Sequence, residues 1–282
     1  MRVLVTGASG PAGRTLLDQL RDRGVWAQGT DMLPQRRPDG IEILRALPAR
    51  DPGYLAQLRA MIEALDIDLL IPTVSEELPI VAAARPPQAI IGPRAAVELA
   101  NDKLLTALVL SQSGVAVPRT IPGGERSSAL TEWVGMPFVT KPRVSRGGRG
   151  VTVHRSWPAS VPVDESMVLA EFLPGEEYAP NVYIAENPAD DVAVVLRKTG
   201  LKDGDVGNAT GVVRVSEPEV ARLAIKAARA LGLRGPADID IRYAADGVPC
   251  VIEINARFGA NSAAAPEILD HVLAAATRLV AA

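Results

Sequence analysis

The sequence has little histidine and almost no cysteine, and these absences exclude several classes of catalytic site. Its 282 residues include 2 histidines and 1 cysteine. His154 and His271 lack the HExxH spacing of a zinc peptidase, and no GxSxG nucleophile turn occurs. A disulfide framework or a cysteine metal cluster needs more than Cys250, which lies in an apolar strand pattern. The residues left for chemistry are carboxylates, lysines, arginines and glycine loops, which together can hold phosphates and magnesium.

An excess of charge of one sign and long apolar runs are also missing. The formal net charge is -3 and the basic residues are scattered, so there is no electrostatic footprint for nucleic acid or an anionic membrane. The sequence contains no run of ~20 apolar residues, the length needed to span a bilayer. The N-terminus enters a glycine-rich turn too early for a signal peptide. We therefore expect a cytoplasmic protein that acts on small molecules.

The first hundred residues alternate between strand and helix patterns, which is typical of a parallel α/β sheet. The expected strands are 2–6, 25–31, 68–72 and 89–92, and the expected helices are 11–23 and 54–65. Gly7, Gly10 and Gly13 follow the first strand and Asp31 ends the second, a spacing that leaves a dinucleotide site as a rival interpretation. No tyrosine precedes a lysine by four residues, as a short-chain reductase requires, and no Gly-x-x-x-x-Gly-Lys-Ser/Thr phosphate loop occurs.

From residue 101 the pattern changes to short strands and glycine-rich turns, which is typical of an α+β domain. The expected helices are 103–113, 218–231 and 266–280, and the expected strands lie around 137–142, 151–154, 167–173, 180–185, 192–198 and 211–215. The boundary between the two domains is therefore expected near residues 95–102.

The strongest chemical signal is an acidic hairpin in the C-terminal part of the chain. Charged and apolar residues alternate along both of its strands, so the charged set shares one face, with Val251 on it and Ile252 opposite. The register that keeps the apolar residues together also brings Asp240, Glu253 and Asn255 together. Facing like charges are destabilising unless a cation compensates them, and these oxygen ligands suit magnesium. The hairpin alone leaves two interpretations open, a solvated polar face and a magnesium site.

Two further segments could hold a nucleotide. Lys141 ends a strand, and the following turn contains Gly147, Gly148 and Gly150, whose backbone amides can close over phosphates. A second turn, over residues 171–178, carries three carboxylates and could offer backbone groups to a base and an acid to ribose hydroxyls. Each segment taken alone favours the interpretation as an ordinary exposed turn.

Taken in order, these segments resemble the ATP-grasp superfamily, in particular the ATP-binding halves of the carbamoyl phosphate synthetase large subunit. The resemblance covers nearly the whole chain. Its motifs are Asp68-Leu69-Leu70-Ile71-Pro72-Thr73 with Glu76-Glu77, Asn101-Asp102-Lys103, Lys141-Pro142-Arg143, the turn 171–178, and Glu253-Ile254-Asn255-Ala256-Arg257-Phe258-Gly259. The resemblance implies an α/β N-terminal Rossmann-like pre-ATP-grasp domain over 1–100. An α+β ATP-grasp domain with two lobes would follow over 101–282, with a small lid lobe at about 115–172 and a large lobe at about 173–282.

For ATP, the resemblance implies lysines on the phosphates, a glycine-rich lid, a hinge against the adenine and a carboxylate on the ribose. The implied nucleotide contacts are Lys103, Lys141, Gly147, Gly148, Arg149, Gly150, Glu171, Phe172, Leu173 and Glu177. The implied metal is Mg²⁺, with two ions at Asp240, Glu253 and Asn255, and with Mn²⁺ as an alternative. Arg257 matches an arginine that faces the γ-phosphate, so Arg257 and Lys141 are the expected catalytic residues.

The implied activity is that of an ADP-forming carboxylate-amine ligase, which makes an acyl phosphate that an amine captures. The expected partners are a small carboxylate, such as an amino acid or small peptide, and an amine, with a homodimer left open. Bicarbonate activation and a non-catalytic ATP-binding subunit are the alternatives. The weak substrate candidates are Arg197, on a strand expected to face the acyl site, and Asn261 with Ser262.

Four positions depart from the family pattern, namely Arg146 in the lid loop, Asn181 in the strand after the hinge, Asp238 and Ala256. Asp238 stands where the family commonly has asparagine. It adds a negative charge beside the expected metal ligands and could be an auxiliary ligand.

Overall fold

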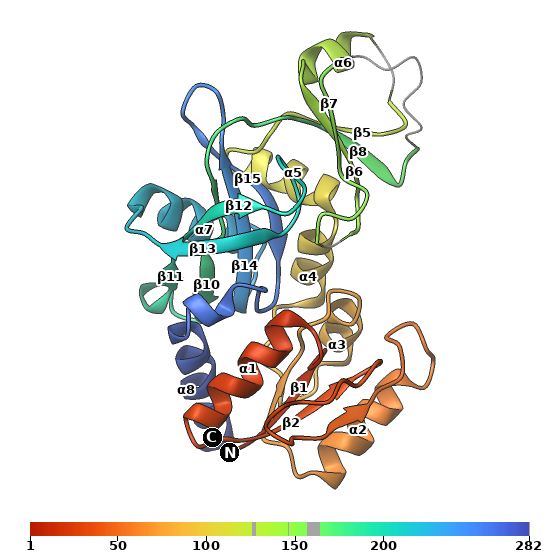
Figure 1. The fold of residues 1–282 in the computed structure, drawn as a ribbon, viewed down its shortest axis with the longest axis vertical. Helices are drawn as coiled ribbons and strands as arrows, with labels where there is room; N and C mark the ends of the chain where they lie inside the picture. Colours follow the sequence, from red (N-terminus) through yellow and green to blue (C-terminus); the bar gives the residue numbers. More distant parts are fainter. Residues whose placement is uncertain (126–127, 146, 157–163, 282) are drawn as a thin grey trace.

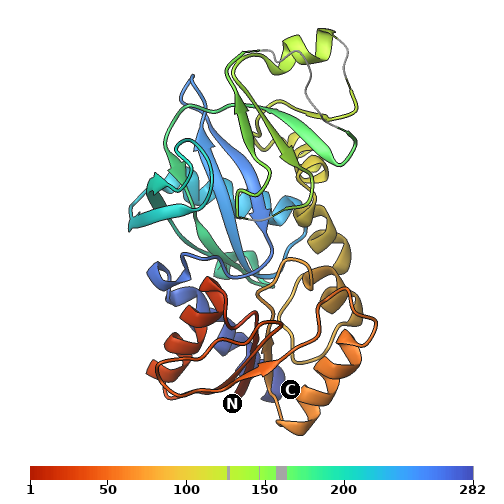
Figure 2. The same ribbon diagram turned by 45° about the vertical axis from the view of Figure 1, so that its right-hand side comes forward.

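Three β-sheets are stacked along the long axis of the molecule (Figure 1). The computed structural model describes residues 1–125, 128–145, 147–156 and 164–281. The N-terminal sheet lies at one end, the largest sheet in the middle and a small sheet at the other end, and the turned view in Figure 2 shows the same order. Both chain termini lie beside the N-terminal sheet.

The N-terminal sheet is parallel, with the strand order β3-β2-β1-β4 in the described part of the chain. Its strands are β1 (Arg2–Thr6), β2 (Trp26–Asp31), β3 (Ile43–Arg45) and β4 (Leu69–Ile71), and its helices are α1 (Pro11–Asp22), α2 (Tyr54–Ala64) and α3 (Leu78–Ala84). The predicted alternation of strand and helix is confirmed, although β3 and α3 were not predicted. The strand expected at 89–92 was wrong, because only one bridge joins Leu70 to Ala89. Flanking prolines remove the N–H groups that a longer ladder needs.

Strand β1 is apolar throughout because both of its faces are covered. Val3 and Val5 pack in a core that contains the leucines of α1, whereas Leu4 packs in a separate core with Leu58 and Ile62 of α2. Strands that are buried on both faces read as continuous apolar runs rather than as alternating ones. The first core also contains residues of α8 (Glu267–Ala281), so the C-terminal helix packs against the N-terminal part of the chain (Figure 1).

The glycine turn after β1 has a packing explanation. Gly7 has φ +57°, a left-handed conformation that favours glycine. A Cβ atom on Gly13 would lie 2.4 Å from the carbonyl oxygen of Gly7, so α1 approaches the turn too closely for a side chain. The carboxylate of Asp31 accepts hydrogen bonds from the backbone N–H of Ser9 at 3.0 Å and of Leu33 at 2.9 Å. Asp31 and these glycines therefore have structural roles.

The carboxylate of Glu77 ties three segments of this part together. The hydroxyls of Thr6 and Tyr54 donate to it, and so do the backbone N–H groups of Thr73 and Val74, each at 3.0 Å. Burial raises the pKa of Glu77 above its ordinary value, while these hydrogen bonds oppose the shift. Four donors on a fully buried side chain make Glu77 a structural residue.

The middle sheet has seven strands within the described ranges, in the order β11-β10-β14-β9-β12-β13 with β15 beside β14. They are β9 (Glu177–Tyr178), β10 (Asn181–Ile184), β11 (Val192–Val194), β12 (Leu196–Leu201), β13 (Ala209–Arg214), β14 (Gly235–Tyr243) and β15 (Pro249–Asn255). Helices α4 (Arg94–Asn101), α5 (Lys103–Gln112) and α7 (Pro218–Ala230) contact β15, and short 3₁₀ turns occur at Pro188–Asp190 and Ser262–Ala264. The predicted strand 192–198 was wrong, because it is two strands that pair with different neighbours.

The small sheet is antiparallel, with the order β5-β8-β6-β7 in the described ranges. It consists of β5 (Thr120–Pro122), β6 (Phe138–Pro142), β7 (Thr152–His154) and β8 (Met167–Glu171), covered by α6 (Ser128–Val134). Its core is separate and small, with Ile121, Val134, Phe138 and Leu169. A sheet with its own core can move as a unit relative to the middle sheet.

We predict that Glu77→Ala lowers the free energy of unfolding by roughly 3 kcal/mol or more, because it leaves four buried donors without an acceptor and opens a cavity. Urea unfolding followed by circular dichroism measures the change. The neighbouring exposed Glu76 is the matched control, and Glu76→Ala should change stability by less than about 1 kcal/mol. Equal effects of the two substitutions would contradict the structural role of Glu77.

Candidate functional site

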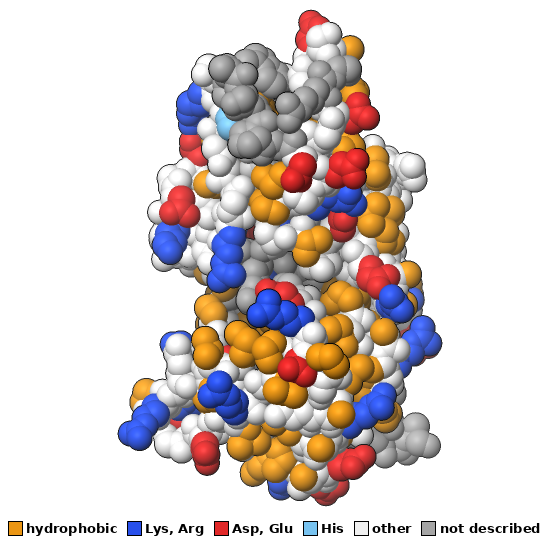
Figure 3. Space-filling model, turned by 90° about the vertical axis from the view of Figure 1, so that its right-hand side faces the viewer, with side chains coloured by type: hydrophobic (Ala, Val, Ile, Leu, Met, Phe, Trp, Pro, Cys, Tyr) orange, Lys and Arg blue, Asp and Glu red, His pale blue; other side chains and the backbone are white. Residues whose placement is uncertain are grey.

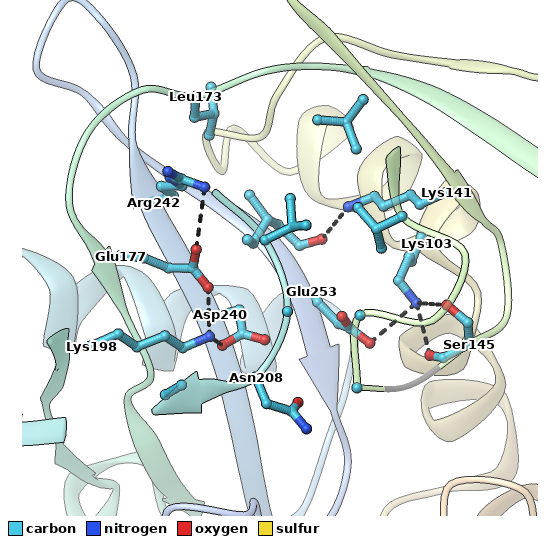
Figure 4. A pocket seen from close by; sticks show the side chains of 18 of the residues that line it. Lys103, Lys141, Ser145, Leu173, Glu177, Lys198, Asn208, Asp240, Arg242 and Glu253 are labelled. Atoms are coloured by element: carbon cyan, nitrogen blue, oxygen red, sulfur yellow. Dashed lines mark hydrogen bonds and ion pairs between the residues drawn. The ribbon is translucent and has the colours of Figure 1, made fainter. Parts of the chain in front are cut away.

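A cavity of about 170 Å³ lies between the middle sheet and the small sheet. Strands β6 and β8 line it from the small sheet, and β12, β14 and β15 line it from the middle sheet, with α5 at its edge. Figure 4 shows charged side chains from both sheets pointing toward one another across it. Elsewhere, acidic and basic side chains are mixed on the face in Figure 3. The cavity is therefore the principal candidate site.

The hairpin β14–β15 forms the floor of this cavity and contains a β-bulge. Asp240 pairs with Glu253, as the predicted register requires, but Ile241 then pairs with Val251, which leaves Ile252 as the extra residue. The expectation that Val251 shares the charged face was wrong, because the bulge turns Val251 into the core and Ile252 toward the cavity. The carbonyl of Ile252 accepts a hydrogen bond from Lys141 Nζ at 3.1 Å.

Lys198 of β12 bridges two carboxylates on the floor of the cavity (Figure 4). Its Nζ lies 2.5 Å from Glu177 Oε1 and 2.6 Å from Asp240 Oδ1. Arg242 approaches the other oxygen of Glu177 at 3.4 Å. Burial lowers the pKa of Lys198, but Asp240 and Glu177 outweigh burial and raise it above the ordinary value. Lys198 therefore carries a permanent positive charge at the centre of the site.

Lys103 gives Glu253 a similar partner from the start of α5. Its Nζ lies 3.2 Å from Glu253 Oε1 and 3.0 Å from the carbonyl oxygen of Ser145. Asp102 caps the helix by accepting from the backbone N–H groups of Leu104 and Leu105, and it also pairs with Arg143 at 2.7 Å. The cap thus fixes Lys103 between the carboxylate on the floor and the loop above it.

Lys141 of β6 is the third lysine of the cavity. Burial lowers its pKa to about 8, Glu253 opposes this shift, and Lys103 adds to it. In the described structure, Lys141 donates a hydrogen bond to the carbonyl of Ile252. Lys141 thus keeps its positive charge below about pH 8 and has no carboxylate among its hydrogen-bond partners in the described structure, so it is suited to receive an anion.

Two glycine-containing loops meet above the floor. A Cβ atom on Gly148 would lie 2.6 Å from Cα of Gly207, and one on Gly147 would lie 3.4 Å from Asn208 Nδ2. Both glycines of the first loop have positive φ, at +64° and +72°. The loop after β6 and the loop between β12 and β13 therefore touch, and residues of both line the cavity.

Most of the predicted site residues meet in this cavity. Those that line it are Lys103, Lys141, Gly147, Gly148, Glu171, Phe172, Leu173, Glu177, Asp240, Glu253, Asn255, Arg257 and Asn261. The sequence singled out these positions on different strands and loops, and the fold brings them together.

Four predicted site residues lie outside the lining of the cavity, namely Arg149, Gly150, Arg197 and Ser262. Arg197 was expected to face the acyl site, but its guanidinium pairs with Glu176 at 2.8 Å and is largely exposed. Successive residues of a strand point to opposite faces, so Lys198 takes the inward place instead. Ser262 is buried, and its carbonyl accepts from Gln19 Nε2 at 2.9 Å. Arg146 lies outside the described residues.

Sequence reasoning missed Lys198, Arg242 and residues 205–208, which also line the cavity. The alternation around Lys198 was visible, because β12 carries Arg197 and Lys198 in succession and only one can face inward. The bulge that exposes the Ile252 carbonyl has no comparable signal in the sequence.

The donor set on the floor fits a hard divalent cation. Asp240 and Glu253 are cross-strand partners, and the amide of Asn255 lies two residues further along β15. Oxygen ligands of this kind suit magnesium. Within the described residues, no group of three or more His, Cys, Asp or Glu side chains is placed to hold a metal together. Any metal here would therefore depend on two carboxylates, an amide and further oxygen atoms from a ligand or water.

Comparison with known proteins gives one family match and several relatives. The model of a family described as ATP-grasp domain matches residues 100–261. The D-alanine--D-alanine ligase of Delftia acidovorans is 28% identical over 182 residues, which cover 56% of this chain and 55% of that protein. That of Cupriavidus metallidurans is 25% identical over 212 residues, 64% of each chain. The chain thus spans about half to two thirds of the length of these relatives.

Solved structures show the same fold at lower identity. An L-amino acid ligase from Bacillus licheniformis is 17% identical with a TM-score of 0.68, covering 93% of this chain and 68% of that one. A biotin carboxylase from Campylobacter jejuni is 16% identical with a TM-score of 0.69, covering 94% and 67%. Such identities establish the arrangement of the chain, and the activity has to be argued from the site. No helix in the described ranges combines the length and apolarity that crossing a membrane requires.

Replacing Lys198 with methionine should lower the free energy of unfolding by roughly 3 kcal/mol at neutral pH, because it leaves Glu177 and Asp240 buried without their shared cation. Burial raises the pKa of Glu177 and Lys198 opposes that shift, so the variant raises the folded-state pKa of Glu177 further. Part of the lost stability should therefore return as the pH falls and Glu177 takes up a proton. Millimolar Mg²⁺ should stabilise the variant more than the parent. Thermal unfolding at several pH values, with and without Mg²⁺, measures both effects. Arg197→Met is the matched control and should change stability by less than about 1 kcal/mol. A loss independent of pH and Mg²⁺ would contradict this account.

Proposed function

The chain belongs to the ATP-grasp family, and we propose that it binds magnesium-ATP in the cavity between its two C-terminal sheets and phosphorylates a small carboxylate. One observation carries the proposal. Three lysines converge on the carboxylate floor, and Lys141 has no anionic partner of its own among its hydrogen bonds in the described residues. Converging cations beside oxygen ligands are the arrangement that phosphoryl transfer needs.

In this proposal, Lys103 and Lys141 contact the phosphates, and the loop with Gly147 and Gly148 closes over them. Residues 171–173 contact the adenine. Glu177 binds the ribose hydroxyls, which requires a shift in its present pairing with Lys198 and Arg242. Lys198 pairs with Asp240, one of the residues that would hold the metal, so it would be free to turn toward the phosphates once that charge is compensated.

Asp240, Glu253 and Asn255 would hold the magnesium, which when bound would neutralise charge on the phosphates. The protein's own residues do the rest. Arg257 orients the carboxylate against the γ-phosphate, and Lys141 stabilises the charge that moves to the leaving ADP. The carboxylate oxygen forms a bond to the γ-phosphorus as the bond to the β–γ bridging oxygen breaks, giving an acyl phosphate and ADP. An amine then displaces inorganic phosphate from the acyl carbon and loses a proton.

We further propose that the carboxylate is an amino acid or a small peptide. The names of the relatives, D-alanine--D-alanine ligase and L-amino acid ligase, support this substrate class. Bicarbonate activation is the alternative and finds support in the biotin carboxylase among the similar folds. A non-catalytic ATP-binding subunit is the second alternative, and the complete set of Asp240, Glu253, Asn255 and Arg257 speaks against it.

The domain assignment is part of the proposal. Residues 1–100 would be a Rossmann-like pre-ATP-grasp domain and residues 101–282 the ATP-grasp domain, with a lid lobe at about 115–172. The parallel sheet and the separate core of the small sheet support this division. The cytoplasmic location and a homodimer stay predictions of the sequence.

The test of the function is ADP release from magnesium-ATP with a panel of amino acids, singly and in pairs, and with bicarbonate. Hydroxylamine is added in a parallel series, because it captures an acyl phosphate as a stable hydroxamate. We expect ADP and hydroxamate with at least one amino acid. ATP binding without ADP release for every acid would leave the binding proposal standing and refute the ligase.

Glu253→Gln should reduce turnover by about 100-fold or more, because it removes a charge from the metal site while keeping the shape of the side chain. Initial rates across a range of Mg²⁺ concentrations measure it, and circular dichroism checks that the chain remains folded. Glu176→Gln is the control, since this exposed glutamate pairs only with Arg197 and Tyr178 in the described structure. Turnover that survives in the Glu253 variant would refute the metal assignment.

The affinity for magnesium-ATP should fall at alkaline pH because Lys141 loses its proton. Its pKa is lowered to about 8, so the cation is present below this pH and absent above it. Between about pH 7.5 and 9.5 the affinity should drop roughly tenfold, the strength of one charge-assisted hydrogen bond. Equilibrium binding of a non-hydrolysable ATP analogue measures the profile. Lys141→Arg should flatten it, since arginine stays charged. A parent profile as flat as that of the variant would count against Lys141 as a phosphate contact.

A further inference from the structure

Asp238 is a buried carboxylate on the wall of the cavity that the proposed function does not use. It lies on β14 and is 8% exposed. Its oxygens have two contacts in the described structure, to Arg257 Nη1 and to Asn181 Nδ2, each 3.4 Å long. By contrast, Glu177, Asp240 and Glu253 each have a lysine at 3.2 Å or closer. Asp238 is thus the one carboxylate among these four without a lysine partner in the described structure, and its ion pair with Arg257 is 3.4 Å long.

The two contacts of Asp238 are long for hydrogen bonds to a carboxylate, at 3.4 Å each, although each donor is an NH2 group that also reaches a nearby carbonyl. Asn181 Nδ2 also donates to the carbonyl of Ala179 at 3.1 Å, and Arg257 Nη1 donates to the carbonyl of Phe258 at 3.0 Å. A buried carboxylate whose hydrogen bonds are long costs free energy unless a further cation compensates it. The arrangement leaves bonding capacity on Asp238 at the end of the cavity that Arg257 and Asn261 line.

The backbone around Asp238 is built to keep its carboxylate in place. A Cβ atom on Gly259 would lie 2.3 Å from Cγ of Asp238, so only glycine fits there. Asp238 pairs with Asn255 in the β14–β15 ladder, and this pairing places the backbone of Asp238 at the floor of the cavity. The carboxylate and the guanidinium of Arg257 therefore stand side by side, one negative and one positive.

We infer that Asp238 binds the α-ammonium group of an amino acid whose carboxylate is held by Arg257, so that the substrate is a free α-amino acid with an unblocked amine. This inference rests on the proposed function and narrows its substrate class. An α-amino acid carries its ammonium on the carbon next to its carboxylate. Its ammonium can therefore contact Asp238 while its carboxylate contacts the adjacent Arg257.

Charge balance favours this class over an acid without an amine. Bicarbonate or a hydroxy acid brings only negative charge, which Asp238 and the neighbouring phosphates would both repel. A zwitterion brings an ammonium to the carboxylate whose ion pair with Arg257 is long, at 3.4 Å. A divalent cation at Asp238 is less favourable than an ammonium, because the guanidinium of Arg257 is 3.4 Å away and repels the larger charge more strongly.

The experiment measures binding separately from turnover. The full chain, saturated with a non-hydrolysable ATP analogue and Mg²⁺, is titrated calorimetrically with α-amino acids, the matched α-hydroxy acids and bicarbonate. At least one amino acid should bind about tenfold or more tightly than its hydroxy acid counterpart. Asp238→Asn keeps the shape of the side chain and removes its charge. It should weaken amino acid binding by roughly 10- to 100-fold, which corresponds to one charged hydrogen bond, and abolish the preference over hydroxy acids. Arg197→Met, outside the cavity, should retain the parent's preference.

Other results overturn the inference. These are equal binding of amino and hydroxy acids by the parent, an equal loss for all acids in Asp238→Asn, or no amino acid whose affinity depends on Asp238. A higher Mg²⁺ requirement for analogue binding in Asp238→Asn would make Asp238 a metal ligand instead. ADP release with the same panel separates the two proposals. Binding that depends on Asp238 without ADP release refutes the ligase alone, whereas ADP release with hydroxy acids or bicarbonate alone refutes the inference alone.

Discussion

The need to balance negative charge in one cavity governs the rest of this structure. Glu177, Asp238, Asp240 and Glu253 all line the space between the two C-terminal sheets. Buried carboxylates this close repel one another and cannot all stay ionised without cations. The chain supplies lysines from β12 and from the start of α5, and an arginine after β15, so the counter-charges come from elements far apart in the sequence. Each of these elements lies where its cation can contact a carboxylate of the cavity.

The same pairing explains how the site could accept a ligand. Lys198 and Lys103 neutralise carboxylates of the floor, and burial lowers the pKa of Lys141 to about 8. In the proposed function, Asp240 and Glu253 would hold a metal, and the lysines that now pair with them would turn to the phosphates, so one positive charge would replace another at the floor. The small sheet has its own core, and a loop from it contributes Gly148 above the floor. Movement of that sheet would then admit the nucleotide.

The sequence predicted the order and type of most elements because their periodicity was strong. The parallel N-terminal sheet followed from alternating apolar runs and amphipathic helices, and the pairing of Asp240 with Glu253 followed from the alternation in the hairpin. What failed depended on tertiary context. The strand pattern over 192–198 gave no sign that the chain changes neighbours within it, and the bulge at Ile252 reverses the faces of Val251 and Ile252 without any local signal.

The sequence predicted only part of the site, because the positions of some of its residues also depend on tertiary context. The order of the motifs along the chain predicted Lys103 and Lys141 as site residues. Arg197 and Lys198 are adjacent, and only the folded sheet decides which of them faces the cavity. Glu77 lies in one of the motifs that carry the family resemblance, but its role is structural. Its carboxylate accepts hydrogen bonds from Thr6, Tyr54 and the turn after β4.

The central claim is that this cavity transfers the γ-phosphate of ATP to a carboxylate. Positional isotope exchange tests it most directly, using ATP with a heavy oxygen label in its β–γ bridge. Reversible formation of an acyl phosphate lets the label scramble into the β-phosphate without any nucleophile. We predict scrambling only when magnesium and an amino acid are both present. Scrambling that needs no acid, or none with any acid although ATP binds, would contradict the account.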